Sequence, residues 1–551
     1  MTGLMLIIFG LVSATYAGPV VDTVYGPVKG LTEHLTEESF IGVDSDFDVF
    51  LGIPFAKPPV GDLRFANPER PDPWSDNYDA TYYRPMCLQM LPGVLSGGVD
   101  EDCLYLNVYA PSPMPTNAAV MVWIHGGAYN VGTAGRAVYG GVPLAAVGGV
   151  IVVTVNYRLG SLGFLSTGDE AAMGNFGSFD QVMALRWVQE NIANFGGDPS
   201  RVTIFGESAG GTSVGLHVVS KESQDLFQSA IMQSGSTLTP FAFNPDIDAA
   251  RSEAFKLGEN VGCSTSSSTE LVDCLRTKSA VDVLVGGLKF AILSAPVVDN
   301  RFLTGNPQDL LEAGDFKHRN ILLGSNHDEG TAWALSIYPD YTLSRTAPHM
   351  SRADYDEHRD DNIDGIVNDI ILDAMDQQYI DWSVADDPNA DYLEQYVNEI
   401  TDQSFAAPAD ALARAFYQHG AGQAYLYEMT HVPSVSMYSY SLIGPRWLGV
   451  THGEEIPFVF GWAFIPEVQQ YRRNLKDEEL EFMVKMMQYW TNFAKTGDPN
   501  SADLPNWPAF TVPELEYMVL EPDLRSDRAL RADTAAFWNG LVPKLAASYA
   551  K

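Results

Sequence analysis

Apolar residues form three short uninterrupted runs in the first half of the chain, at residues 118–124, 149–155 and 201–205. The runs are rich in β-branched residues and do not alternate with polar ones, which is typical of strands buried on both faces of a sheet. Between the last two runs, apolar residues recur at helical spacing over residues 181–195. A strand, a helix and a further strand in this order predict a parallel α/β sheet.

Later parts of the chain extend this core. Residues 321–325 predict another buried strand that runs into a polar loop, and residues 480–493 carry an apolar stripe at helical spacing that indicates core packing. Acidic residues crowd the stretch 354–391, which we interpret as an exposed helical face rather than a binding site. With 551 residues the chain is long enough for a large core, and no internal repeat divides it.

Residues 206–210 read Gly-Glu-Ser-Ala-Gly and lie between the expected strand 201–205 and a small-residue helix that follows. A serine in a Gly-x-Ser-x-Gly turn between a strand and a helix sits on a strained backbone with its hydroxyl exposed. The same pattern recurs at residues 211–215, but no strand precedes it there. We therefore predict that Ser208 is a nucleophile and that Ser213 is structural.

A serine hydroxyl is a poor nucleophile and needs a neighbouring base, normally histidine, which in turn needs an orienting carboxylate. After a turn of this kind the three residues follow in the order serine, acid, histidine. Asp328 and Glu329 lie in the loop after the expected strand 321–325, where a sheet presents its active site. The residues alone do not decide between these two carboxylates.

Five histidines follow this loop, and His452 is the preferred base among them. It lies on a glycine-flanked loop directly before an apolar element at residues 456–460. Of the other four, two lie in polar surroundings and are expected to be exposed, one lies near a helix end where a cation suits the dipole, and one precedes a Val-Pro pair. These are His349 and His358, His419, and His431, respectively.

Acyl transfer also requires hydrogen-bond donors for the oxyanion that develops on the substrate. The backbone amide directly after the nucleophile, at Ala209, is one candidate. Residues 125–129 read His-Gly-Gly-Ala-Tyr and follow the expected strand 118–124, so this glycine loop can supply the other donors.

The charge of the chain excludes several partners. The formal net charge is −37 and the sequence pI is about 4.4. Such a balance repels nucleic acid and anionic membrane surfaces, so we expect neither as a partner.

The start of the chain predicts export. Residues 4–12 form a short apolar run, small residues follow, and Thr-Tyr-Ala at residues 15–17 gives a cleavage site before Gly18. This pattern predicts a secretory signal over residues 1–17. No later apolar run is long enough to span a bilayer, and we expect no stable membrane anchor.

The four cysteines are expected to form disulfides rather than to bind a metal. An even number in an exported chain suggests two disulfides, and the grouping along the chain favours local pairs. These pairs join Cys87 to Cys103 and Cys263 to Cys274. Since no Cys-x-x-Cys or His-x-x-x-His ligand set occurs, we predict no metal site.

Several segments together resemble the type-B carboxylesterase/lipase family, which includes cholinesterases, animal carboxylesterases and secreted fungal lipases. Residues 195–210 resemble the serine signature of the family throughout, and residues 101–108 resemble its second signature. Residues 50–56 resemble its N-terminal motif, and Trp507-Pro508 also fits. The resemblance implies a single α/β-hydrolase domain over residues 18–551, with a mixed, mostly parallel sheet flanked by helices.

The resemblance also implies a role for each candidate residue. In the acid motif of the family the second carboxylate belongs to the triad, so Glu329 is favoured over Asp328, and His452 matches the family histidine. Members often have Gly where Ala128 stands, but a backbone N–H is present in either case. The matched oxyanion donors are Gly127, Ala128 and Ala209, the residues matching positions behind the triad are Glu207 and Ser234, and both cysteine pairs resemble disulfides of the family.

The chain departs from the family in its first cysteine loop, residues 88–102. In the family this loop often carries a lid or an aromatic choline site. Here the loop is short and contains no Trp, so we do not expect a cholinesterase. Its Pro and Gly residues disfavour a long helix, and we predict a largely open site.

By this resemblance the protein is expected to be a secreted carboxylesterase that works through an acyl-serine intermediate and needs no cofactor. Its substrate would be a small-molecule or lipid ester. A lipase or sterol esterase that acts on long-chain esters is the alternative among enzymes. A non-catalytic binding or adhesion relative is not expected, because such relatives typically lack a triad residue. The oligomeric state and the acyl preference stay open.

Overall fold

The computed structural model describes residues 18–90, 98–135, 137–287, 295–342, 344–361, 368–438 and 446–549. The expected signal, residues 1–17, lies outside these ranges, as do residues 91–97 of the first cysteine loop.

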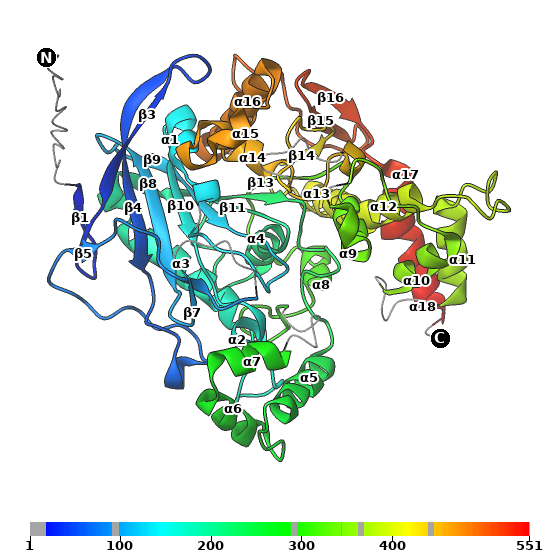
Figure 1. Cartoon of the computed structure of the whole chain (residues 1–551), viewed down its shortest axis with the longest axis horizontal. Helices are drawn as coiled ribbons and strands as arrows, with labels where there is room; N and C mark the ends of the chain where they lie inside the picture. The colour runs from blue at the N-terminus through cyan, green and yellow to red at the C-terminus, as the bar shows by residue number, and fades with distance from the viewer. Residues whose placement is uncertain are drawn as a thin grey trace, which may run out of the picture.

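In these ranges an 11-stranded sheet forms the centre of the molecule (Figure 1). Its strands from β10 across to β15 run parallel, whereas β3, β4 and β8 at one side and β16 at the other are antiparallel to their neighbours. The sheet confirms the expected mixed, mostly parallel α/β-hydrolase architecture. In spatial order the strands are β16 (Arg525–Arg528), β15 (Glu516–Leu520), β14 (Ala424–Met429), β13 (Asn320–Asn326), β12 (Ser229–Gln233), β11 (Gly197–Glu207), β9 (Ala118–Ile124), β10 (Ile151–Val155), β8 (Tyr105–Pro111), β4 (Val43–Pro54) and β3 (Leu31–Glu37).

The predicted elements are present, with shifted ends. The run 118–124 is β9, the run 149–155 contains β10, and the run 201–205 is the core of the longer β11. The helix between the last two runs begins earlier than the apolar spacing indicated, and β9 lies between β10 and β11 in the sheet. Helices of this region and beyond are α3 (Phe176–Asn191), α4 (Ala209–Val219), α5 (Ile247–Asn260), α6 (Ser268–Thr277), α12 (Leu393–Thr401), α13 (Ala407–His419) and α16 (Asp477–Thr496).

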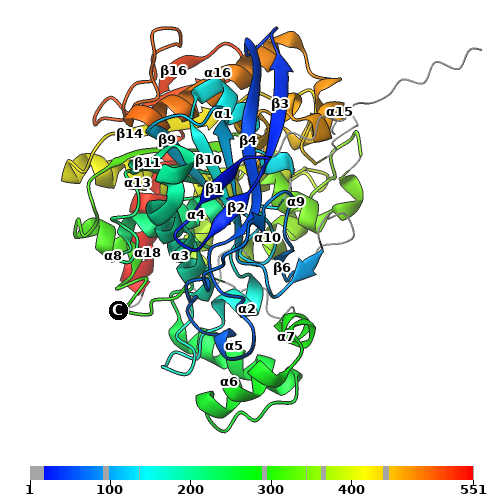
Figure 2. The same cartoon turned by 90° about the vertical axis from the view of Figure 1, so that its left-hand side faces the viewer.

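Alternate residues of the central strands face two separate layers of the core. In β9, Val120 and Val122 belong to a buried cluster that includes α3 and α4, whereas Met121 and Trp123 belong to a second cluster that includes α1 (Val142–Gly148) and α16. Both faces of the sheet are thus covered by helices (Figures 1 and 2). This double cover explains why the strand sequences are apolar without alternation.

Two groups of helices lie outside this core, one at the bottom and one at the right of Figure 1. One group is α5, α6 and α7 (Ala280–Gly287), and the other contains α10 (Arg352–Asp361), α11 (Asp369–Tyr379) and α18 (Val542–Tyr549). Within the acidic stretch 354–391, the described residues of α10 and α11 belong to the second group, and they are exposed only in part, because Ile371 and Met375 of α11 are fully buried against α18. Within the described ranges, no helix is both long and apolar enough to cross a bilayer.

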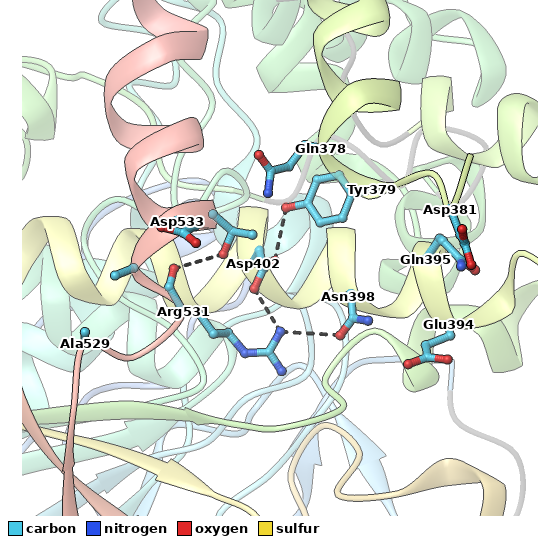
Figure 3. A pocket seen from close by; sticks show the side chains of 12 residues that line it. Gln378, Tyr379, Asp381, Glu394, Gln395, Asn398, Asp402, Ala529, Arg531 and Asp533 are labelled. Atoms are coloured by element: carbon cyan, nitrogen blue, oxygen red, sulfur yellow. Dashed lines mark hydrogen bonds and ion pairs between the residues drawn. The ribbon is translucent and has the colours of Figure 1, made fainter. Parts of the chain in front are cut away.

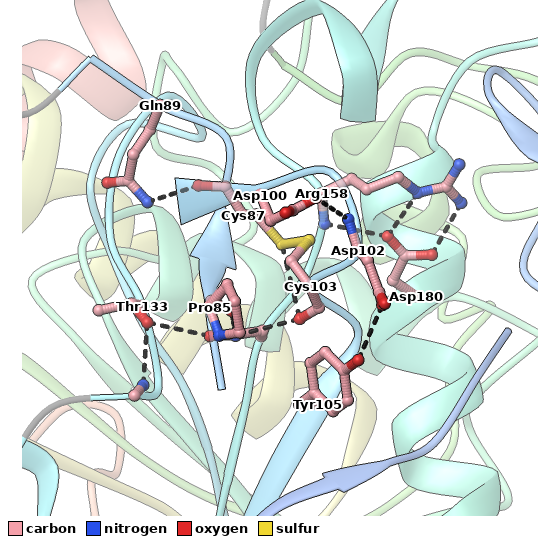
Figure 4. The surroundings of a disulfide bond; sticks show 12 residues. Pro85, Cys87, Gln89, Asp100, Asp102, Cys103, Tyr105, Thr133, Arg158 and Asp180 are labelled. Atoms are coloured by element: carbon pink, nitrogen blue, oxygen red, sulfur yellow. Dashed lines mark hydrogen bonds and ion pairs between the residues drawn. A yellow bond between two sulfur atoms is a disulfide. The ribbon is translucent and has the colours of Figure 1, made fainter. Parts of the chain in front are cut away.

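Both predicted disulfides are present. Cys87 is bonded to Cys103 with an S–S distance of 2.04 Å, and Cys263 is bonded to Cys274 at 2.07 Å. Figure 4 shows the first of them beside the polar side chains that fix its surroundings. Among these is Gln89, whose amide donates to the carbonyl of Gly132 at 2.7 Å and accepts from its N–H at 2.8 Å. The first cysteine loop is therefore tied to the glycine loop that follows β9.

Candidate active site

Three of the sequence-predicted residues follow neighbouring parallel strands at the same edge of the sheet. Ser208 follows β11, Ser234 follows β12, and Glu329 lies in the loop after β13. The register places Glu207 opposite Gln233, so the ends of β11 and β12 are level. Loops that are far apart in the sequence therefore meet at this edge.

The backbone at Ser208 explains why glycines surround it. Ser208 has φ 56° and ψ −125°, a conformation that L-residues rarely adopt. A Cβ at Gly206 would lie 2.6 Å from the carbonyl oxygen of Ile124, and one at Gly210 would lie 2.0 Å from the same oxygen. Larger residues at either position would push the turn away from the end of β9. The turn has the strained geometry of a nucleophile elbow.

The second serine of the repeated pattern lies in a different setting. Ser213 is within α4, is buried, and donates from its hydroxyl to the carbonyl of Ala209 at 2.8 Å. Its hydroxyl also accepts from the side chain of Gln181 at 3.2 Å. These contacts fit the structural role expected for Ser213.

His452 and Glu329 are in direct contact. Nδ1 of His452 lies 2.6 Å from Oε2 of Glu329, which is fully buried. The other carboxylate oxygen of Glu329 accepts from the Ser234 hydroxyl at 2.5 Å and from the backbone amide of Asn326 at 2.7 Å. Both oxygens of the carboxylate are thus held in place, and the ring is held by the carboxylate.

Asp328 faces away from this contact. Its Oδ2 accepts from the backbone amide of Val450 at 2.8 Å, and its Oδ1 lies 2.9 Å from Nδ1 of His327. The two adjacent carboxylates that the residues alone did not separate therefore have different partners. Only Glu329 of the two contacts His452.

Ser208 and His452 line one cavity, which is described below, and the four other candidate histidines do not line it. His349 is exposed, His358 is half-buried on α10, and His419 is the last residue of α13. His431 lies 3.1 Å from a carboxylate oxygen of Glu479 through its Nε2. His358 was expected to be exposed, and its partial burial corrects that expectation.

The Nε2 atom of His452 lies 3.1 Å from Oε1 of Glu207, the residue before Ser208. Burial lowers the pKa of His452, but attraction to Glu207 and Glu329 and the hydrogen bond to Glu329 outweigh burial and raise it to about 9. Burial raises the pKa of Glu207 to about 8, with Glu455 and Glu329 acting in the same direction and His452 opposing them. Among the described residues, the Ser208 hydroxyl has no hydrogen-bond partner, so in this arrangement Nε2 faces Glu207.

Ser208 and His452 line a cavity of about 780 Å³. Gly127 and Ala128 line it as well, and both have positive φ, 107° and 51°. A Cβ at Gly127 would lie 2.1 Å from the carbonyl oxygen of Val131, which excludes a larger residue there. Among the described residues, the amides of Gly127, Ala128 and Ala209 donate to no acceptor, and they are free to bind a ligand oxygen.

Two aromatic residues that the sequence did not indicate pack against the histidine, and a third packs against these two. Trp333 of α9 (Thr331–Ile337) and Phe405 of η6 (Asp402–Ala406) pack against the His452 ring, with centroid distances of 5.3 and 5.1 Å. Phe241 contacts both of them and also lines the cavity with Trp333. No local signal separates these rings from other core aromatics, because their positions depend on packing between distant segments.

A second cavity of about 790 Å³ lies between α11, α12 and the segment after β16 (Figure 3). Its most buried charges are paired, because Arg531 donates to Asp402 at 2.9 Å and to Glu428 at 3.0 Å. Tyr379 also donates to Asp402, at 3.1 Å. No serine or histidine lines this cavity. In the part of the chain that the structure describes, no group of three His, Cys, Asp or Glu residues could hold a metal ion.

Comparison with known proteins finds similarity over nearly the whole chain. Residues 17–538 match the model of the carboxylesterase family. The chain is 38% identical to an acetylcholinesterase of Bungarus fasciatus, over 95% of this chain and 86% of the relative. It is also 38% identical to an acylcarnitine hydrolase of Mus musculus, over 96% of this chain and 92% of the relative.

Proposed function

Because this chain belongs to the carboxylesterase family and is a carboxylic ester hydrolase, we propose that Ser208, His452 and Glu329 form its catalytic triad. The observation that carries the proposal is the 2.6 Å contact between His452 and Glu329 at the cavity that Ser208 also lines. A histidine oriented by a buried carboxylate is the arrangement that activates a serine.

In the proposed reaction the hydroxyl oxygen of Ser208 attacks the carbonyl carbon of the ester while Nε2 of His452 takes the proton. The bond to the alcohol oxygen then breaks, and His452 gives the proton to the departing alcohol, which leaves an acyl group on Ser208. A water molecule attacks this acyl group, passes its proton to His452, and the acid leaves as Ser208 regains a proton. Glu329 orients the ring and stabilises its positive charge in both halves of the reaction.

The pKa of Glu207 bears on how His452 becomes a base. A charged imidazolium cannot accept the serine proton. Because burial raises the pKa of Glu207 to about 8, this carboxyl can hold a proton at neutral pH. A proton on Glu207 removes one of the charges that raise the pKa of His452, so it favours the neutral ring, whose Nε2 can then turn from Glu207 to the serine hydroxyl.

The amides of Gly127, Ala128 and Ala209 are the proposed oxyanion donors. Their support is that two of them line the cavity and that none donates to another acceptor among the described residues. Donors that are already in place stabilise the negative charge without reorganisation. The methyl group of Ala128 narrows the site but leaves its amide available.

We further propose that residues 1–17 are a secretory signal and that the rest of the chain is one exported domain. The two disulfides support an oxidising compartment. A single domain is supported by the central sheet, which takes strands from β3 near the start to β16 near the end of the described chain.

The proposed substrates are small and medium esters rather than long-chain lipids. The cavity of about 780 Å³ has the size of a small-molecule site, roughly 300–1,000 Å³. Apolar residues, among them Trp333 and Met437, line it together with the polar groups of the reaction. Such walls suit an acyl or alkyl chain of limited length.

A fluorophosphonate, which forms a covalent adduct with activated serines, tests the nucleophile. Mass spectrometry should find the adduct on the peptide that contains Ser208 in the wild type and in Ser213→Ala, but not in Ser208→Ala. Rates for p-nitrophenyl esters from acetate to palmitate, measured on both sides of their solubility limits, test the substrate class. We expect turnover of the short and medium esters without detergent. A sharp rise in rate at the emulsion point would favour the lipase instead.

A further inference from the structure

One wall of the ester cavity is an irregular segment with no strand or helix of its own. Residues 434–438, here called the wall segment, come after β14 and contribute Met437 and Tyr438 to the cavity lining. An irregular segment lacks ladder or helix hydrogen bonds, so side chains must hold it in place. The side chains that hold the wall segment in place therefore affect the shape of the cavity.

Glu454 provides the first of these contacts. It lies two residues after His452 and is fully buried. One carboxylate oxygen accepts from the hydroxyl of Ser436, and the other accepts from the backbone amide of Met437 at 3.1 Å. The Ser436 hydroxyl in turn accepts from the amide of Tyr438 at 3.2 Å. Both carboxylate oxygens are used, and both hold the wall segment.

A second link joins the wall segment to the histidine itself. The Tyr438 hydroxyl donates to the backbone carbonyl of His452 at 3.1 Å. Gly453 lies between His452 and Glu454 in the sequence, and a Cβ there would come within 3.0 Å of the Met437 sulfur. Gly453 also has φ 84°, so this position favours glycine for two reasons. The wall segment and the histidine segment are thus tightly apposed.

The neighbouring glutamate faces the other way. Glu455 accepts from Gln233 at 3.1 Å and from Asn326 at 2.7 Å, and both donors lie at the ends of sheet strands. Glu455 therefore ties the histidine segment to the sheet, whereas Glu454 ties it to the wall. The side-chain hydrogen bonds of Glu454 involve the wall segment and not the His452 ring.

We propose that Glu454 is a positioning residue that holds Met437 and Tyr438 against the bound ester and thereby sets which chain lengths the enzyme accepts. The inference rests on the proposed function, since it concerns the same cavity. It predicts that loosening the wall weakens contacts with a long ester chain more than contacts with a short one. The effect should appear mainly in KM, because the wall touches the chain and not the reacting bond.

Steady-state kinetics on p-nitrophenyl acetate and p-nitrophenyl hexanoate test this inference. In Glu454→Ala we expect the ratio of kcat/KM for hexanoate to that for acetate to fall by on the order of 10-fold, mostly through KM. Glu454→Gln keeps one acceptor oxygen and should restore part of the ratio. Met437→Ala should show the same fall, and adding Glu454→Ala to it should change the ratio little further, since both act on one contact.

Tyr489→Phe is a matched control, because it removes a buried hydroxyl that donates to the carbonyl of Pro505 at 2.6 Å, away from the cavity. It should leave the ratio unchanged. Hydrogen exchange of the amides of Met437 and Tyr438 should become faster in Glu454→Ala and Ser436→Ala, and this readout does not depend on turnover. An unchanged ratio in Glu454→Ala, or an equal loss of kcat on both esters, would overturn the proposal. Failure of the wild type to hydrolyse either ester would instead refute the proposed function.

Discussion

The ester cavity and the Arg531 cavity are almost equal in volume, about 780 and 790 Å³, but their charged groups are partnered in opposite ways. Arg531 donates to Asp402, to Glu428 and to the carbonyl of His327, so its charge is matched by fixed acceptors. In the ester cavity a single ring, that of His452, faces two carboxylates. The guanidinium of Arg531 keeps its charge, whereas the His452 ring can gain or lose a proton.

Backbone strain does not separate the two cavities. Arg531 has φ 43° and Ser208 has φ 56°, both in the region that L-residues rarely adopt. The difference lies in what surrounds them. Arg531 has its hydrogen bonds made, whereas the hydroxyl of Ser208 and the amides of the proposed oxyanion donors have no partner among the described residues. Cavity size therefore does not separate the two sites, and our assignment of the reactive site rests instead on unpartnered polar groups beside a titratable ring.

The largest expected effect removes the reactive groups of the ester cavity. Ser208→Ala and His452→Ala should each lower kcat for ester hydrolysis by on the order of 10⁴-fold or more, and the double variant should lose little beyond either one. Steady-state assays of p-nitrophenyl acetate hydrolysis measure the fall in kcat. Ser213→Ala is the control and should retain turnover. Nearly full activity in Ser208→Ala would mean that the comparison names the wrong cavity.

A smaller effect separates the two adjacent carboxylates. Glu329→Gln should lower kcat by on the order of 10³-fold, because the ring loses its orienting charge. Asp328→Asn should cost much less, since that carboxylate contacts the Val450 amide rather than His452. The same assay measures both. A large loss in Asp328→Asn beside an active Glu329→Gln would reverse the assignment.

The Arg531 cavity should respond in stability rather than in activity. Arg531→Met leaves Asp402 and Glu428 buried without their cation, and we expect it to lower the free energy of unfolding by about 3 kcal/mol. Urea unfolding measures the loss, and active-site titration with the fluorophosphonate counts the folded sites. Turnover per folded site should stay within about threefold of the wild type. Arg528→Met, at an exposed position, is the matched control and should change stability little. A large loss of turnover per site would show that the two cavities are coupled.

The smallest expected effect is a shift in pH dependence. His452 must be neutral to act as a base, so kcat/KM should fall as pH decreases, with a midpoint above the ordinary histidine value of 6.5 because Glu207 and Glu329 raise its pKa. Glu207→Gln removes one of these charges and should move the midpoint to lower pH. Rates on p-nitrophenyl acetate across pH measure the shift, and Glu478→Gln on the surface is the control. A midpoint that stays in place or rises would contradict the charge relation between Glu207 and His452.

Local patterns were sufficient to predict the elements around Ser208. The strand at 201–205, the Gly-x-Ser-x-Gly turn and the following helix lie within twenty residues, so burial pattern and turn chemistry determine them together. The same holds for β9 and its glycine loop. Element ends were less accurate, as at β10 and α3, because the ends depend on packing and capping rather than on apolar spacing.

Local sequence patterns did not predict in which direction a side chain points. Two pairs of adjacent acids, Asp328 with Glu329 and Glu454 with Glu455, look alike along the chain. In the fold the two members of each pair have different partners. Glu329 contacts the His452 ring, whereas Asp328 accepts from the backbone amide of Val450. Glu455 contacts the sheet, whereas Glu454 contacts the wall segment. Contacts of this kind join residues more than a hundred positions apart in the first pair, and no local pattern encodes them.

By itself the sequence determined the α/β class, the order of the central strands along the chain, the turn that carries Ser208 and the family resemblance. These follow from apolar periodicity and from short motifs whose backbone demands are local. The tertiary structure decided what the residues without the resemblance left open, namely that Glu329 rather than Asp328 contacts His452. It also showed that Glu207 faces the same ring and that Arg531 is paired with Asp402. The physical reason is that a carboxylate acts through the group it touches after folding, and parallel strands bring such groups together only when the sheet is complete.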